Sequence, residues 1–180
     1  PELKVDYSWD AKTKLAKLSV KQEQKVDDKV MLFHLKLPVA FKVGKKTVLR
    51  SVEISKVSED YYFALPVAPE IVRVDPDLTL LAKITFAPPA SMLHAQLLDH
   101  EDVVGRLLAV EQLAKKKDAG TVEKLKIALN EDPFHGVRMA ASKALREIAT
   151  EPSFEALAKA KEQDDARVRR QVIGDVGSFY

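Results

Sequence analysis

The sequence has no cysteine among its 180 residues, which excludes a disulfide framework, a thiolate metal site and a cysteine nucleophile. A strong charge of either sign is also missing, because 29 basic and 27 acidic residues leave a net charge of +2. This balance argues against nucleic acid or an anionic membrane surface as a partner. No apolar run reaches the roughly 18 residues of a membrane helix, so no membrane segment is predicted.

The start of the chain carries neither a signal peptide nor a methionine, since it opens with Pro1 and a charged, non-apolar stretch. We therefore expect a piece cut from a longer polypeptide, and the sequence leaves a removed leader open. A Gly-rich phosphate loop and a G-x-S-x-G nucleophile motif are both missing. What remains is an ordinary globular composition, with 46% hydrophobic and 31% charged residues, enough for one large domain or two small ones.

The first half of the chain, from Leu3 to Phe86, has a period of two, which is typical of strands with one buried face. Polar breaks at residues 26–29, 43–46 and 58–60 are expected to be hairpin turns. About seven such strands predict an antiparallel β-sandwich. The expected inward residues are Ala16, Leu18 and Val20, then Phe33, Leu35 and Leu37, then Val48, Val52 and Ile54, and finally Leu78, Leu80, Ala82, Ile84 and Phe86.

Pro88 and Pro89 mark the expected domain boundary, because proline is excluded from the interior of a strand or helix. After them the period becomes 3.6 and the sequence repeats. GRLLAVEQLAKK (105–116) aligns with VRMAASKALREI (137–148) at a shift of 32, and that copy aligns with VRRQVIGDVGSF (168–179) at a shift of 31. Second helices are expected in TVEKLKIALN and PSFEALAKAKE, which lie between the copies, and an acidic turn ends each unit.

A helix pair about every 30 residues predicts an α-solenoid of HEAT-like helix pairs. The predicted fold class is therefore α+β with two domains, a β-sandwich at 1–88 and a helical repeat domain at 89–180. Small residues at Ala109 and Ala141 are expected to let neighbouring helices approach closely. The third repeat looks truncated, and whether the solenoid continues beyond residue 180 stays open.

The stretch HEDVV, His100 to Val104, is one residue short of the H-E-x-x-H zinc motif. That motif needs two imidazoles one helical turn apart, and Val104 stands where the second would be. We expect Glu101 and Asp102 instead to cap the helix that follows, as the acidic turn at 130–132 precedes the next copy. No catalytic, cofactor-binding or metal-ligating residue is predicted in this chain.

Three other groups have a functional and a structural interpretation, and the structural one is favoured for each. Arg167, Arg169 and Arg170 could bind phosphate or an acidic peptide, but Asp164 and Asp165 lie beside them. Since Arg138 and Arg169 hold the same repeat position, we expect interhelix hydrogen bonds there. The lysines at 115–117 suit the dipole of a helix end. A ligand surface from aromatic residues is less favoured than sheet or core packing of Trp9, Tyr61, Tyr62 and Phe63.

Two stretches of the first half resemble the β-sandwich that follows the catalytic domain in zinc aminopeptidases of the aminopeptidase N family. LKVDYSWDAKTKLAKLSVKQEQ (3–24) is similar to its opening, with an aromatic-Asp pair at Trp9-Asp10 and a V-x-Q-x-Q strand end at Val20, Gln22 and Gln24. VRVDPDLTLLAKITF (72–86) resembles its closing stretch, through Val72, Asp75 and Pro76. A helical domain follows in both. The helical half looks more regular and more HEAT-like than in many members.

The resemblance implies that the G-x-M-E-N loop and the H-E-x-x-H zinc site of the family belong to a preceding domain, because neither motif occurs in this chain. It implies a non-catalytic C-terminal fragment that braces a zinc-dependent catalytic domain and shapes access to its substrate cavity. The family also has non-catalytic relatives, notably a large subunit of a core-promoter transcription factor. A protein-interaction scaffold is therefore the alternative, with a peptide or protein partner on the concave helical face.

Overall fold

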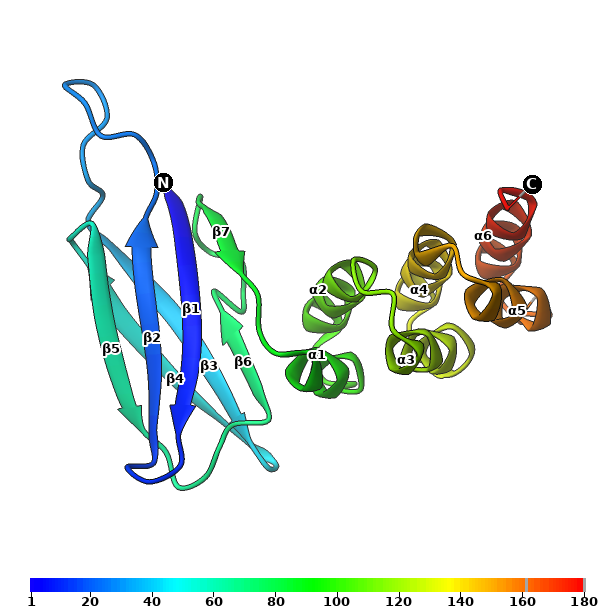
Figure 1. Ribbon diagram of the computed structural model, residues 1–180, viewed down its shortest axis with the longest axis horizontal. Helices are drawn as coiled ribbons and strands as arrows, with labels where there is room; N and C mark the ends of the chain where they lie inside the picture. Colours follow the sequence, from blue (N-terminus) through cyan, green and yellow to red (C-terminus); the bar gives the residue numbers. More distant parts are fainter. Residues whose placement is uncertain (161, 180) are drawn as a thin grey trace. The chain divides into compact units, whose positions relative to one another are not determined.

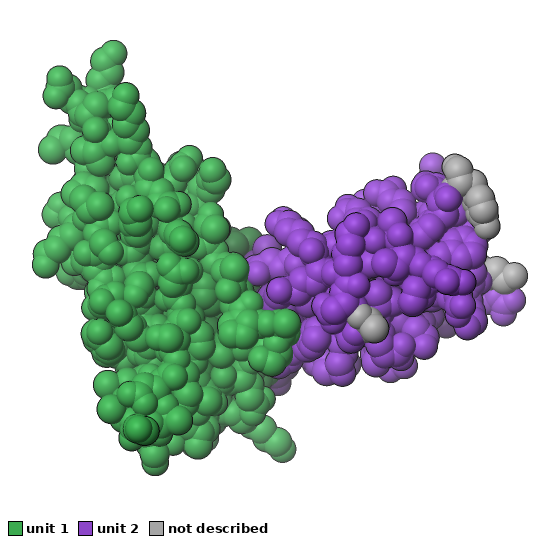
Figure 2. Space-filling view, in the orientation of Figure 1, with its two compact units in different colours: residues 1–92 green, residues 93–180 purple. Residues whose placement is uncertain are grey.

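The computed structural model describes residues 1–160 and 162–179, which form seven strands followed by six helices (Figure 1). The predicted fold class is thereby confirmed as two sheets followed by helix pairs. The chain divides into two compact units, residues 1–92 and 93–180 (Figure 2). This division falls inside helix α1, and the domain boundary at residues 88 and 89 stays a prediction. Within the described part of the chain, no helix is long and apolar enough to cross a membrane.

Unit 1 consists of two facing sheets with strand orders β5-β2-β1-β7 and β4-β3-β6. All neighbouring strands are antiparallel except β1 and β7, which pair in parallel with Glu2 opposite Lys83. The strand bounds are β1 (Glu2–Asp10), β2 (Leu15–Gln22), β3 (Leu35–Val43), β4 (Lys46–Ile54), β5 (Ser58–Ala64), β6 (Ile71–Val74) and β7 (Lys83–Phe86).

The core of unit 1 lies between the two sheets, because alternate residues of each strand share one face. Of the inward side chains that the period of two predicts in β2 and β3, Leu35 is half-buried and the others are buried: Ala16, Leu18, Val20 and Leu37. Phe41 and Phe63 meet across the sheets with ring centroids 4.9 Å apart. Tyr61 of β5 donates a hydrogen bond of 2.6 Å to the carbonyl of Glu53 in β4 and so also links the two sheets.

Two predicted hairpin turns are wrong and one is confirmed. Residues 43–46 do form the β3–β4 turn, where Gly44 adopts a φ of 57° that favours glycine. The break at 26–29 instead lies inside a long connection, 23–34, which passes from one sheet to the other, and Phe33 is in this loop rather than in a strand. Residues 58–60 begin β5, because the chain turns earlier, at 55–57.

The predicted strand over 77–86 is also too long, because only Lys83–Phe86 pairs with a neighbour. Asp75, at a φ of 46°, holds the residues that follow it as a loop. Its buried carboxylate accepts hydrogen bonds from the backbone N–H of Thr79 at 2.9 Å and of Leu80 at 3.0 Å. These donors would otherwise need a neighbouring strand, so the alternation of leucines here does not produce a strand.

Unit 2 consists of helix pairs around one apolar core. The helices are α1 (Ala90–Leu97, whose start lies in unit 1), α2 (Val103–Leu113), α3 (Ala119–Glu131), α4 (His135–Ile148), α5 (Glu151–Lys159) and α6 (Ala166–Gly177). Ala109 and Ala141 are fully buried in α2 and α4, as the repeat alignment predicts for small residues between helices. Lys161 and Tyr180, which the predicted repeats include, lie outside the described residues.

Candidate functional site

The incomplete zinc motif forms the start of an ordinary helix. His100 is exposed in the turn between α1 and α2, so it does not share a helix with His94. Asp102 is the N-cap of α2, and its carboxylate accepts a hydrogen bond of 2.7 Å from the Gly105 N–H, which confirms the predicted cap. Over residues 1–160 and 162–179, no group of three or more His, Asp or Glu side chains could hold a metal. The resemblance assigns the zinc site of the family to a preceding domain, and that expectation stays a prediction.

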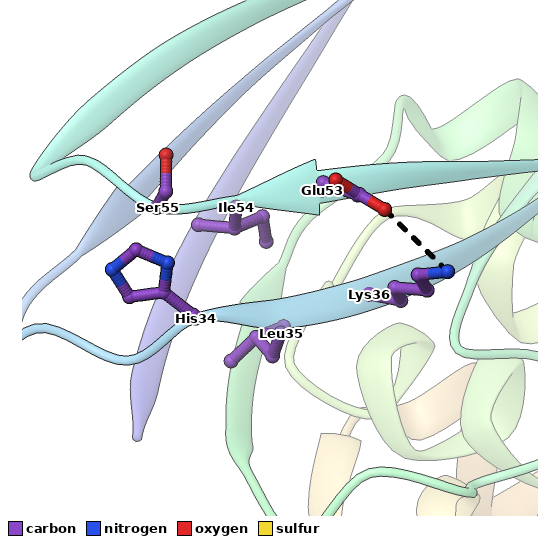
Figure 3. A pocket seen from close by; sticks show the side chains of 6 residues that line it. All are labelled: His34, Leu35, Lys36, Glu53, Ile54 and Ser55. Carbon is purple, nitrogen blue, oxygen red and sulfur yellow. Dashed lines mark ion pairs between the residues drawn. The ribbon is translucent and has the colours of Figure 1, made fainter.

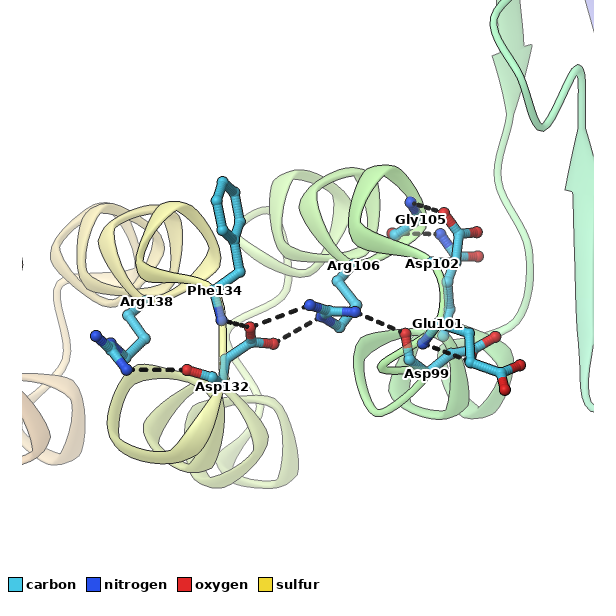
Figure 4. A network of polar contacts seen from close by, with 9 residues as sticks. Asp99, Glu101, Asp102, Gly105, Arg106, Asp132, Phe134 and Arg138 are labelled. Carbon is cyan, nitrogen blue, oxygen red and sulfur yellow. Dashed lines mark hydrogen bonds and ion pairs between the residues drawn. The ribbon is translucent and has the colours of Figure 1, made fainter.

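The main polar site of unit 2 is a buried ion pair between two successive helix pairs (Figure 4). Arg106 of α2 is 1% exposed, and its Nε and Nη2 donate to the two carboxylate oxygens of Asp132 at 2.7 and 3.2 Å. Its Nη1 donates to the Asp99 carbonyl at 2.9 Å, and Asp132 also accepts from the Phe134 N–H at 2.8 Å. This two-point geometry satisfies both buried charges and fixes α2 against the turn between α3 and α4.

The equivalent arginines of the next two repeats make only part of this contact. Arg138 donates to the Asp132 carbonyl at 3.1 Å (Figure 4), and Arg169 donates to the carbonyls of Gln163 and Asp164. Each arginine thus ties its helix to the turn that precedes it, so the predicted hydrogen bonds at Arg138 and Arg169 go to turn carbonyls and not to another helix. At the place of Asp132, the third repeat has Gln163, whose side-chain amide donates instead to Asn130 at 3.1 Å.

A second buried polar cluster joins α4 to α6. Asp175 is 1% exposed, and one of its oxygens accepts a 2.6 Å hydrogen bond from the Ser142 hydroxyl. Gln171 donates to the same carboxylate at 3.0 Å, and Arg146 lies 3.3 Å from it. The sequence analysis did not identify this cluster or the Arg106–Asp132 pair. The repeat alignment marks equivalent positions but does not show which partner either carboxylate meets.

The remaining charged and aromatic candidates are engaged structurally. Arg167 forms a 2.7 Å ion pair with Asp165, which caps α6, and this contact lowers the pKa of the Asp165 carboxyl. Residues 115–117 follow the end of α2, as predicted. Trp9 and Tyr61 pack against the sandwich core, and Phe63 is buried in it. Tyr62 is exposed on the outer sheet face, where the Lys17 ammonium lies 5.8 Å from its ring centroid.

Unit 1 has a shallow pocket of about 510 Å³ beside the start of β3 and the end of β4 (Figure 3). It is lined by His34, Leu35, Lys36, Glu53, Ile54 and Ser55. Lys36 and Glu53 pair with each other across the two strands at 3.4 Å, and both are largely exposed. The lining therefore offers a contact surface, with one imidazole and one ion pair.

The connection between β2 and β3, residues 23–34, carries exposed apolar side chains among exposed charged ones, and we call it the crossover loop. Its base is held by the buried carboxamide of Gln22, which accepts from the Phe33 N–H and donates to the Phe33 carbonyl, both at 2.9 Å. The same amide donates to the Lys56 carbonyl at 3.2 Å. Met31 is nevertheless 74% exposed. The other exposed apolar side chains of the loop are Val26, Val30 and Phe33.

Comparison with known proteins finds a repeat family for the helical part and a solved structure of similar fold. A family model of HEAT repeats matches residues 90–175. The crystal structure of Legionella pneumophila aminopeptidase A in complex with aspartic acid is similar to this chain, with a TM-score of 0.57 and 11% sequence identity. The match covers 99% of this chain but only 23% of that chain. A comparison with curated protein sequences gave no match. The chain therefore has a β-sandwich and HEAT-repeat architecture that resembles part of an aminopeptidase structure.

Proposed function

We propose that this chain is a non-catalytic C-terminal part of a zinc-dependent aminopeptidase of the aminopeptidase N type. The observation that carries the proposal is the structural match, in which nearly the whole chain superimposes on 23% of Legionella pneumophila aminopeptidase A. A match of this extent includes both the sandwich and the helices. Chemistry would then be performed by another part of the polypeptide, where zinc is expected. The two units would brace that part and limit access to its substrate cavity.

The crossover loop supports a bracing role for the sandwich. Gln22 binds the backbone at the base of the loop, while Met31, at 74% exposure, and its apolar neighbours face water. Exposed apolar clusters are typical of surfaces that another domain or protein covers. In the proposed parent protein, the occupant of this surface is the catalytic domain.

The first test of this proposal is the coding sequence upstream of Pro1, translated in frame. We expect a G-x-M-E-N loop, then H-E-x-x-H and a later Glu. The isolated chain should bind no stoichiometric zinc, measured by atomic absorption after dialysis, and should not hydrolyse aminoacyl anilides. An upstream domain without those ligands, or zinc-dependent turnover by the chain alone, would refute the proposal.

A second test uses the full-length polypeptide and asks whether the crossover loop contacts the catalytic part. Met31→Lys should lower the thermal midpoint of the catalytic domain and raise its susceptibility to proteolysis. Leu49→Ser is the matched control, because Leu49 is 65% exposed on β4, outside the loop. Equal effects of the two substitutions would mean that the crossover loop does not contact the catalytic part.

A protein-interaction scaffold is the second candidate, and exposed residues on α6 favour it. Arg169, Arg170 and Ile173 are all exposed on this helix. Arginine and large apolar side chains are enriched where protein partners bind. The upstream sequence distinguishes the two candidates, because a non-catalytic relative would lack the zinc ligands.

A further inference from the structure

The connection between β6 and β7, residues 75–82, exposes leucine side chains, and we call it the leucine loop. Leu81 is 98% exposed, more than any other large apolar side chain in the described part of the chain, and Leu78 is 61% exposed. Single exposed apolar residues are common on protein surfaces, so their exposure alone carries no argument. The conformation and the position of this loop make the two leucines unusual.

The leucine loop has a fixed conformation in which a leucine is locally unfavourable. Leu78 has a φ of 52°, in the left-handed region where the Cβ atom comes close to the following carbonyl oxygen. Its N–H donates to the Asp75 carbonyl at 3.0 Å, and the Asp75 N–H donates to the Pro38 carbonyl of β3 at 2.8 Å. The turn is therefore tied to the sheet while its leucine faces water. Backbone outliers of this kind are most frequent at functional sites.

The leucine loop and the crossover loop lie on either side of the first residues of the chain (Figure 1). The Lys83 N–H, directly after the leucine loop, donates to the Pro1 carbonyl at 2.9 Å. The Glu23 N–H, which begins the crossover loop, donates to the Glu2 carbonyl at 2.8 Å. Both loops therefore reach the same end of the sandwich next to Pro1. A segment joined to Pro1 would leave the sandwich between them.

We propose that the leucine loop and the crossover loop form one docking surface, and that its occupant is the part of the polypeptide that directly precedes Pro1. The inference rests on the proposed function, in which a catalytic domain comes before the sandwich. The similar aminopeptidase structure has room for such an occupant, because this chain covers only 23% of it. Leu81 and Met31, one from each loop, would be buried against an apolar face of that domain.

The position of Pro1 favours a covalently attached occupant over a separate protein. A domain on a short tether has a high effective concentration at the surface beside the tether, so weak apolar contacts are sufficient to hold it there. Both exposed loops lie beside the point where this tether would begin. A separate partner would have no such advantage at this end of the sandwich.

The experiment uses the full-length polypeptide and measures the crossover loop while the leucine loop is changed. Methionine oxidation by dilute hydrogen peroxide, followed by peptide mass spectrometry, gives separate rates for Met31 and Met92. Met31 reports on the cover of the crossover loop, and Met92, which is 8% exposed in the sandwich core, reports on unfolding of the sandwich. We expect Met31 to be oxidised much more slowly than free methionine.

Two substitutions in the leucine loop test whether the loops share an occupant. Leu81→Ser should raise the rate of Met31 oxidation about tenfold, because it removes one buried leucine from the shared surface, and should leave the Met92 rate unchanged. Leu78→Asn should act in the same direction without weakening the fold, since asparagine tolerates the left-handed conformation. Leu49→Ser is the matched control, because Leu49 is exposed on β4, outside both loops.

Three results would overturn the proposal. If Met31 in the unsubstituted polypeptide is oxidised as fast as free methionine, the crossover loop is uncovered. If Leu81→Ser leaves the Met31 rate unchanged, the two loops do not share an occupant. If the protection of Met31 is lost on dilution, the occupant is a separate molecule.

The upstream coding sequence tests the proposed function independently of this inference. Zinc ligands upstream together with an unprotected Met31 refute only the docking surface. A protected Met31 that Leu81→Ser exposes, in a polypeptide without zinc ligands, refutes only the peptidase and leaves the docking surface in place.

Discussion

The two units differ in where their buried polar side chains lie. In the sandwich, Gln22 and Asp75 are buried at loops, where they bind backbone groups, and the centre between the sheets is formed by apolar residues such as Leu18 and Phe41. In the helical unit, Arg106, Asp132 and Asp175 are buried between helices and bind one another or a neighbouring side chain. The two sandwich residues shape loops, whereas these three residues of the helical unit join neighbouring helices.

This difference follows from the backbone. Strands exchange main-chain hydrogen bonds, which set the register between neighbours without help from side chains. Helices satisfy the main-chain groups of their middle turns internally, so the position of one helix against another depends mainly on side-chain contacts. Two-point contacts such as Arg106–Asp132 specify one offset between repeats. Substitutions at these buried polar residues should therefore affect loops in the sandwich and contacts between helix pairs in the helical unit.

Removing the carboxylate of Asp132 should have the largest effect. Asp132→Ala leaves the Arg106 guanidinium buried with only the Asp99 carbonyl as acceptor, so we expect a loss of about 3–5 kcal/mol in the free energy of unfolding. The double variant Arg106→Met, Asp132→Leu should restore most of it, since no buried charge remains. Chemical denaturation measures both. If the single variant is within about 0.5 kcal/mol of the unsubstituted chain, the Arg106–Asp132 pair does not stabilise the contact between these helix pairs.

Removing the carboxamide of Gln22 tests the corresponding role of a buried polar group in the sandwich. Gln22→Ala leaves the Phe33 N–H and the Phe33 and Lys56 carbonyls without that partner, and we expect a loss of about 1–3 kcal/mol. Hydrogen exchange should accelerate in the crossover loop and remain unchanged in α2–α6. Acceleration spread evenly over β2 and β5 would instead mean that Gln22 stabilises the sheet.

Alkaline pH should weaken the sandwich through Tyr7. Burial raises the pKa of the Tyr7 phenol to about 12, and its hydroxyl has no hydrogen-bond partner in the described residues. The folded-state pKa lies above the ordinary value near 10. The contribution of Tyr7 to the free energy of unfolding is therefore fully present below pH 10 and is lost between pH 10 and 12. Tyr7→Phe should reduce the slope of stability against pH in that window. Tyr61, whose pKa burial also raises to about 12, should keep titrating in this variant, as followed by phenolate absorbance.

Introducing a carboxylate between the second and third helix pairs should give a small gain in the free energy of unfolding. Gln163→Asp copies Asp132 into the third repeat, at the position that the repeat alignment matches to the partner of Arg106. By the same alignment its partner would be Arg138, whose buried Nε has no acceptor in the described part of the chain. We expect an increase of about 1 kcal/mol in the free energy of unfolding, reduced from a full charged hydrogen bond by the cost of burying the charge. The gain should vanish when Arg138→Gln is also present. A decrease in stability would mean that the contact between the second and third helix pairs is not equivalent to the contact between the first and second.

The sequence predicted the fold class because both periods are strong. Alternation placed Leu18 and Leu37 in the core, and the repeat placed Ala109 and Ala141 between helices. Alternation failed where loop chemistry overrides it. Leu78 and Leu80 alternate like strand residues, yet the carboxylate of Asp75 binds the N–H groups of this segment and holds it as a loop. The hydrogen bonds from Thr79 and Leu80 to Asp75, four and five residues earlier, explain why this segment is a loop and not a strand.

The connectivity of the sandwich and the joints between repeats were harder to predict. A polar break such as 26–29 looks the same whether it joins adjacent strands or crosses between sheets, because turn residues report only local conformation. The repeat alignment marked Arg106, Arg138 and Arg169 as equivalent, but not which carboxylate each would meet. That choice depends on the packing of a helix against the following pair, and a single sequence contains no direct signal for it.

The parallel pairing of β1 with β7 also bears on how the chain is made. Glu2 meets Lys83, so one side of β1 stays without its neighbour until the ribosome has released nearly all of the sandwich sequence. Pairings this distant in sequence form slowly, whereas a helix pair closes within about 30 residues. The N-terminal unit is therefore synthesised first, but it needs almost its entire length before its four-stranded sheet is complete. A helix pair of the second unit can form its internal contacts as soon as its two helices have left the ribosome.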